Sequence, residues 1–164
     1  MINRLFRVRL SVRSAFLLGI AVYLLDQATK YLAKQNIGPY EVIPVTAFFN
    51  LVYVENLGSA FGMFRDLGVY FFIGVAIVAA VIVSYLILKD SENRLAFSFV
   101  LGGALGNLTD RIVHGAVIDF FDFYVGSFHW PAFNVADVGL CIGIGMLLIH
   151  TFFFEGRGKK PAHD

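Results

Sequence analysis

Cysteine is almost absent from this chain of 164 residues, and charged residues are scarce. Because Cys141 is the single cysteine, an intrachain disulfide and a cysteine metal cluster are both excluded. The four histidines do not have a metal-ligand spacing such as HxxxH. We therefore expect no metal cluster, and we expect Cys141 to be a small, buried apolar residue.

The scarcity of charge points to a membrane protein. Charged residues make up 15% of the chain, hydrophobic residues make up 58%, and the mean hydropathy is +0.72. An ordinary soluble domain is only about half apolar. Residues 69–88 form a run of 20 residues without a charge, which is long enough to cross the ~30 Å hydrocarbon core as a helix. The net charge of +1 says nothing about partners, and we expect no nucleic acid among them.

Four transmembrane helices are predicted, at approximately 15–34, 69–88, 95–114 and 134–154. Nine of the 13 Lys and Arg residues lie before the first span, between the second and third, or after the fourth. The positive-inside rule therefore places both termini in the cytoplasm. We expect a single membrane-embedded domain over 1–164 in which most residues are helical.

Two links, 35–68 and 115–133, then lie outside the cytoplasm. Both are rich in Val, Phe and Tyr, as strands are, so we expect a small β element on the outer face. If the second link is extended, the side chains of Asp119 and Asp122 point to opposite faces. The tail 155–164 is expected to be disordered.

Polar residues gather at the outer ends of three predicted spans. A polar stripe facing lipid is costly, so these residues should face the bundle interior or interfacial water. They are Asp26, Lys30 and Lys34 in the first span, Asn107, Asp110, Arg111 and His114 in the third, and Asn134 and Asp137 in the fourth.

Several of these residues also have local explanations. Asp26 and Lys30 are four apart, which indicates an intrahelical ion pair or a role in shaping a site, and Lys30 could also extend to the interface. Asp110 and Arg111 could form a surface pair at the headgroups. The glycines at 102 and 106 have a spacing that allows helices to pack closely.

Asn134 and Asp137 fit the N-cap and third position of a helix, where an amide and an acid are favoured. Capping needs no second carboxylate, yet Asp119 is predicted at the same membrane face. Two carboxylates in a partly dehydrated site share a proton, so that one activates water while the other polarises a scissile carbonyl. The chain has no recognisable Ser–His or Cys–His arrangement, so peptide hydrolysis by an acid pair is the best-supported chemistry.

Five motifs resemble those of the lipoprotein signal peptidases, the bacterial signal peptidase II family. They are DQATK (26–30), NLGSAFG (56–62), GGALGNLTDR (102–111), VIDFFDF (117–123) and FNVAD (133–137). The resemblance implies an aspartic endopeptidase without metal or cofactor, with Asp119 and Asp137 as the catalytic dyad. It further implies four transmembrane helices with a β-sheet cradle and a short amphipathic helix on the outer face.

The resemblance also implies the substrate and its contacts. The family removes the signal peptide from diacylglyceryl-modified prolipoproteins, on the N-terminal side of the lipidated cysteine, at the outer face of the bacterial cytoplasmic (inner) membrane. Partners would be this substrate and membrane lipid, and the enzyme would be a monomer. Substrate-binding positions are Asn56, Gly58, Asn107, Arg111 and Asn134, while Asp26, Lys30 and Asp110 match structural motif positions.

Two other functions remain open at this point. A proton-coupled transporter would have carboxylates spread across the bilayer depth and inverted repeats, and no repeat is evident. A non-catalytic lipid-binding or assembly protein would use the polar residues only to stabilise helix ends.

Overall fold

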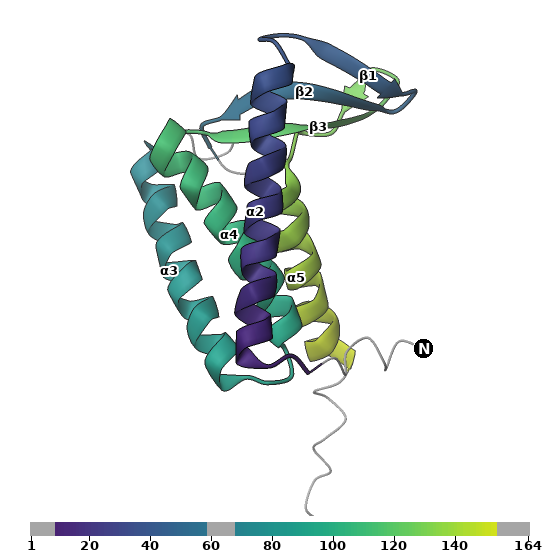
Figure 1. The fold of residues 1–164 in the computed structure, drawn as a ribbon. Helices are drawn as coiled ribbons and strands as arrows, with labels where there is room; N and C mark the ends of the chain where they lie inside the picture. The colour runs from purple at the N-terminus through teal and green to yellow at the C-terminus, as the bar shows by residue number, and fades with distance from the viewer. Residues whose placement is uncertain (1–8, 59–67, 154–164) are drawn as a thin grey trace, which may run out of the picture.

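The computed structural model describes residues 9–58 and 68–153. Within them, four long helices stand side by side, and a four-stranded antiparallel sheet lies across one end of the helices (Figure 1). In chain order the elements are α2 (Val12–Asn36), β1 (Val42–Thr46), β2 (Phe49–Asn56), α3 (Gly68–Lys89), α4 (Arg94–His114), β3 (Val117–Val125), β4 (Phe128–His129) and α5 (Val135–Phe153).

The helices follow the predicted spans, with bounds that differ by at most three residues. α2, α3 and α5 are each long and apolar enough to cross a membrane. α4 has 21 residues but carries Asn107, Asp110 and Arg111 in the half nearer the sheet, and it does not meet the same criterion of length and apolar character. A fourth span therefore stays a prediction, one that is compatible with the packing of α4 against α2, α3 and α5.

Glycines let α4 approach its neighbours closely, as their spacing predicts. A Cβ at Gly102 would lie 2.6 Å from the carbonyl oxygen of Gly19 on α2. A Cβ at Gly103 would collide with the carbonyl oxygen of Ala136 on α5, and one at Gly106 with the carboxylate of Asp26. α4 can thus bring its polar residues into contact with both helices.

The prediction that Cys141 is buried is wrong, because its side chain is exposed. Exposed apolar residues of α5, including Val138, Ile142 and Ile144, lie close to it in sequence. In a bilayer such a surface meets lipid, where a thiol is tolerated as a small apolar group.

The strand-rich composition of both links correctly predicts the sheet, whose strand order is β1-β2-β3-β4. β2 pairs with β3 so that Val54 lies opposite Asp119 and Asn50 lies opposite Asp122. A register shift between Leu51 and Val54 adds one residue to β2. Because of this bulge, Asn50 and Val54, which are an even number of positions apart on β2, lie opposite Asp122 and Asp119, which are an odd number apart on β3.

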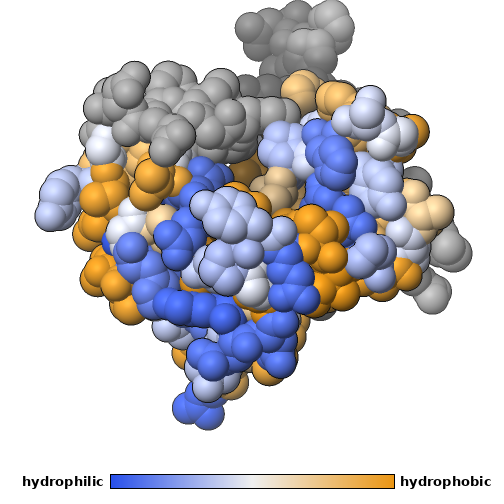
Figure 2. Space-filling view, turned by 90° about the horizontal axis from the view of Figure 1, so that it is seen from above, coloured by the Kyte–Doolittle hydropathy of each residue, from blue (hydrophilic) through white to orange (hydrophobic). Residues whose placement is uncertain are grey.

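The two ends of the bundle differ in character. The start of α2, the α3–α4 link and the end of α5 lie at the end opposite the sheet (Figure 1), where Arg9 pairs with Glu92 at 2.9 Å. Seen from the sheet end, hydrophilic side chains form a band between apolar ones (Figure 2). Among the described residues of the two outer links there is no short amphipathic helix, and the predicted disordered tail lies outside the described residues.

Candidate active site

Asp119 and Asp137 reach the sheet end of the bundle from different elements, β3 and the first turn of α5, and Asn134 joins them. The Asn134 amide donates to Asp119 Oδ1 at 2.6 Å. Its Oδ1 accepts from the Asp137 N–H at 2.9 Å, and the Asn134 N–H donates to Asp137 Oδ2 at 3.3 Å. The capping interpretation is correct, but one residue both caps α5 and binds the second acid, so capping and a paired-acid site coexist.

Asn107 on α4 contacts both Asp137 and Asn134. Its Nδ2 donates to Asp137 Oδ1 at 2.8 Å, and its Oδ1 accepts from Lys30 Nζ at 2.9 Å and from Asn134 Nδ2 at 3.2 Å. Because an ammonium group can only donate, the Asn107 oxygen must face Lys30 and its amide nitrogen must face Asp137. Lys30 thereby fixes the orientation of the amide that binds the dyad.

Asn56 at the end of β2 completes the hydrogen bonding of Asp119. Its Nδ2 donates to Asp119 Oδ2 at 3.0 Å, while its Oδ1 accepts from the Gly58 N–H at 3.0 Å. Each oxygen of the Asp119 carboxyl group therefore accepts from an amide. The rest of the NLGSAFG motif, 59–62, lies outside the described residues.

Asp119 lies in an environment that favours its protonated form. The side chain is almost fully buried, with 2% of the residue exposed. Burial raises the pKa of Asp119 to about 7, and repulsion from Asp137 adds to the rise. Hydrogen bonds from Asn56 and Asn134 and the charge of Lys30 oppose it. A carboxyl group that holds a proton near neutral pH beside a second carboxylate is a pattern typical of acid–base sites.

A buried ionic cluster lies beneath the dyad. Lys30 Nζ is 2.8 Å from Asp26 Oδ2 and 2.9 Å from Asp110 Oδ2. Asp26 also accepts from the Ala136 N–H at 2.8 Å, and Asp110 accepts from the Ile118 N–H at 3.0 Å. The cluster therefore holds the residues next to both acids, one at the start of α5 and one on β3.

The contacts of the buried ionic cluster decide between the alternatives that the sequence left open for Lys30 and for Asp110. The intrahelical Asp26–Lys30 pair is present, but Lys30 is 2% exposed and does not extend to the interface, whereas Lys34 is exposed. The surface pair between Asp110 and Arg111 is wrong, since Asp110 is 2% exposed and faces Lys30. The glycine at 106 leaves room for Asp26, which lets two helices share one lysine.

Arg111 links three elements around the dyad. Its Nη1 donates to the Asn107 carbonyl oxygen at 3.2 Å, and its Nη2 donates to that of Gly58 at 3.1 Å. Its guanidinium lies over the ring of Phe72 on α3, 5.2 Å from the ring centroid. The charge of Arg111 also interacts with Asp119 and Asp137.

Two residues of the site were missed by sequence reasoning. Gln27 donates to Asp26 Oδ2 at 3.2 Å, to Asp110 Oδ1 at 3.1 Å and to the Gly106 carbonyl oxygen at 3.2 Å. Phe72 supports Arg111. The position of Gln27 beside Asp26 in DQATK was a usable signal, whereas nothing in the apolar run around Phe72 distinguishes it from its neighbours.

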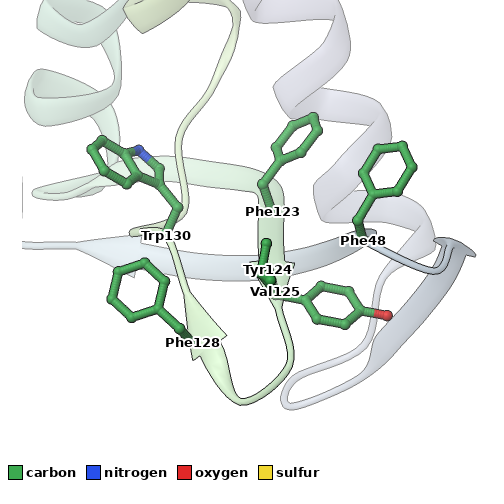
Figure 3. Close-up of a pocket in the computed structure, with 6 residues that line it drawn as sticks. All are labelled: Phe48, Phe123, Tyr124, Val125, Phe128 and Trp130. Atoms are coloured by element: carbon green, nitrogen blue, oxygen red, sulfur yellow. The ribbon is translucent and has the colours of Figure 1, made fainter.

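An apolar groove of about 430 Å³ lies on the sheet near the site. Figure 3 shows the rings of Phe48 and Phe123 next to each other, with Phe128 and Trp130 on the other side of the groove. This groove shares no residue with the Asp119–Asp137 pair or with the buried ionic cluster. Its lining consists of Phe48, Phe123, Tyr124, Val125, Phe128 and Trp130. Within 9–58 and 68–153, no group of three His, Cys, Asp or Glu side chains is arranged to hold a metal ion.

The long apolar helices indicate a membrane protein, and an acidic, hydrogen-bonded site lies at one end of them. The family model described as Signal peptidase (SPase) II matches residues 18–153. The chain belongs to the signal peptidase II family.

Individual relatives agree with this membership. A protein of Thermodesulfovibrio yellowstonii named lipoprotein signal peptidase is 49% identical over 123 residues, which are 75% of this chain and 84% of that protein. One of the same name from Actinobacillus succinogenes is 39% identical over 90% of this chain and 93% of its own length. A solved bacterial membrane enzyme has a TM-score of 0.82 at 28% identity, covering 92% of this chain and 94% of that one.

Proposed function

We propose that this chain is an aspartic endopeptidase that removes the signal peptide from diacylglyceryl-modified prolipoproteins, cleaving on the N-terminal side of the lipidated cysteine. The family membership supports the substrate class. The observation that carries the aspartic mechanism is the Asp119–Asn134–Asp137 connection, which holds two carboxyl groups from separate segments in one buried network. Asp119, with its raised pKa, holds the shared proton.

The proposed reaction follows from the placement of the shared proton on Asp119 rather than on Asp137. Asp137 takes a proton from a water molecule as the water oxygen attacks the scissile carbonyl carbon, and Asp119 donates its proton to the carbonyl oxygen. The tetrahedral intermediate then collapses: Asp137 gives its proton to the nitrogen, the C–N bond breaks, and one hydroxyl of the intermediate returns a proton to Asp119. The amine of the lipidated cysteine leaves, the new carboxyl end of the signal peptide is released, and both acids return to their starting state.

The predicted substrate-binding residues divide into two groups. Asn134 and Asn107 are 0% and 8% exposed and bind the acids, so we assign them to positioning the dyad. Asn56 and Arg111 are partly exposed at the rim, with Gly58 between them, and are better placed to contact the peptide. A guanidinium suits peptide carbonyls or headgroup oxygens.

The location of the acids favours this function over a transporter. The acidic residues of the four helices are Asp26, Asp110 and Asp137, and contacts bring all three together at the sheet end. A relay across the bilayer would need acids at several depths. Arg9, Arg13, Lys89 and Arg94 at the other end support, by the positive-inside rule, a site at the outer face of the cytoplasmic membrane.

Incubation of the purified protein with a diacylglyceryl-modified precursor tests the function directly. We expect release of the signal peptide from the modified precursor and none from the unmodified one, because the lipid anchor holds the scissile bond at headgroup depth. A chelator should leave the rate unchanged. Absence of cleavage would contradict the proposed activity, and chelator-sensitive cleavage would contradict the aspartic mechanism.

The activity should fall as pH rises through about 7. Because the pKa of Asp119 is raised to about 7, the group is protonated below that pH and loses the proton needed by the carbonyl oxygen above it. The measurement is kcat/KM from about pH 5 to about pH 9, with circular dichroism to show that the helices persist. A flat profile between about pH 6 and about pH 8 contradicts Asp119 as the acid.

A further inference from the structure

The two acids lie on either side of one β-hairpin. Asp119 is on β3, and the chain then turns through β4 and a short link into α5, which carries Asp137. β3 and β4 pair through two residue pairs, Tyr124 with His129 and Val125 with Phe128, and an isolated bridge joins Phe121 to Phe133 beyond them. How tightly the hairpin closes therefore affects the separation of the two acids.

The link after β4 transmits this closure to the dyad. The Trp130 N–H donates to the Phe123 carbonyl oxygen at 2.8 Å, and the Phe133 N–H donates to that of Phe121 at 3.1 Å. Asn134, which binds Asp119 and caps α5, follows directly. A shift of the hairpin would displace Asn134 relative to β3.

A buried carboxylate fastens the hairpin. Asp122 is 7% exposed and accepts from Asn50 Nδ2 on β2 at 2.9 Å. Its two oxygens lie 2.9 and 3.0 Å from Nδ1 of His129 on β4. The His129 ring also stacks on Tyr124, with 5.1 Å between ring centroids. One carboxylate thus joins β2, β3 and β4 through side chains.

We propose that Asp122 and His129 form a latch that positions the catalytic dyad by holding β4 and the following link against β3. The proposal rests on the proposed function. Neither residue shares a hydrogen bond with Asp119 or Asp137, so both are positioning residues and take no part in the chemistry. The Nδ1–H of His129 donates to Asp122 in the charged ring and in one neutral tautomer.

The test compares His129→Ala with His129→Asn. Alanine removes the donor, whereas the asparagine amide nitrogen lies near the position of Nδ1 and retains it. We expect His129→Ala to lower kcat about tenfold with KM within about twofold, and His129→Asn to stay within about threefold of the parent kcat. Asp122→Asn should lower kcat by about tenfold or less, since its remaining oxygen still accepts from His129.

A second measurement reports on the surroundings of Asp119 in the absence of substrate. Burial and repulsion from Asp137 are the two largest influences on Asp119, and both weaken if the hairpin opens. The pKa of Asp119, followed by ¹³C NMR of labelled aspartate, should therefore fall in His129→Ala and stay near the parent value in His129→Asn. The emission of Trp130, the only tryptophan, should shift only in His129→Ala.

The outcomes separate the latch from the proposed function. If the parent cleaves the precursor and His129→Ala keeps its kcat and the pKa of Asp119, the latch is wrong and the dyad stands. If His129→Asn loses as much as His129→Ala, the Nδ1 hydrogen bond is not the cause and the latch is also wrong. If the parent does not cleave, the function fails, and the NMR titration alone decides whether the latch positions Asp119.

Discussion

Replacement of Asp119 or Asp137 by asparagine should each reduce cleavage of the lipidated precursor by about 10³-fold or more. In the proposed mechanism, an amide cannot supply the proton that Asp119 would give to the carbonyl oxygen, and it cannot accept a proton from water in place of Asp137. Each asparagine also keeps only one acceptor oxygen where two donors now bind, Asn56 and Asn134 at position 119. The measurement is the initial rate of signal-peptide release, with melting temperature and circular dichroism as checks on folding.

A matched control is Asp90→Asn. Asp90 lies in the α3–α4 link at the opposite end, where its carboxylate caps the N–H groups of Glu92 and Asn93. This change makes the same Asp-to-Asn replacement without touching the site, so the rate should be retained. If both dyad variants are folded and keep turning over substrate, the catalytic assignment is refuted and the non-catalytic interpretation gains support.

Local sequence patterns predicted local structure well. Asp26 and Lys30 lie one helical turn apart, and Asn134 and Asp137 have the spacing of a helix cap, so each contact depends only on helix geometry. The helix positions followed from hydropathy for the same reason. Spacing alone could not show that Asp110 shares Lys30, because that contact joins two helices.

The arrangement around the dyad depends on contacts between distant segments. That Asn134 binds Asp119 and Lys30 orients Asn107 follows from how α2, α4, α5 and β3 pack, and no periodicity encodes it. The resemblance to the family motifs predicted most of these residues as site residues, but it did not predict their hydrogen-bond partners. The prediction that Cys141 is buried was wrong for a related reason, since an apolar position on a membrane helix can face lipid or protein.

The polar residues of α4 show where hydropathy misleads. Its outer half loses apolar character because Asn107, Asp110 and Arg111 serve the site. The cost is limited because α4 packs against the three other helices and these groups meet hydrogen-bond partners within the protein. The predicted fourth span therefore carries polar residues of the site, and these residues lower its hydropathy.

Replacement of Lys30 by methionine should lower the free energy of unfolding by about 3–5 kcal/mol. Methionine has a similar length but no charge, so Asp26 and Asp110, which are 0% and 2% exposed, lose their shared cation in a buried site. The free energy of unfolding would be measured by denaturant titration in detergent micelles. Lys34→Met is the matched control, because Lys34 is one turn further along α2 and exposed, and its unfolding midpoint should not change.

Two further variants separate the charge of Lys30 from its packing. Lys30→Met combined with Asp110→Asn removes one of the stranded charges, so the double variant should be more stable than Lys30→Met alone. In Lys30→Met the Asn107 oxygen no longer faces an ammonium group, so its amide can rotate away from Asp137 and kcat should fall even in the folded fraction. Equal stability of Lys30→Met and Lys34→Met would show that Asp26 and Asp110 are neutral without Lys30, and the buried ionic cluster would then not support the dyad.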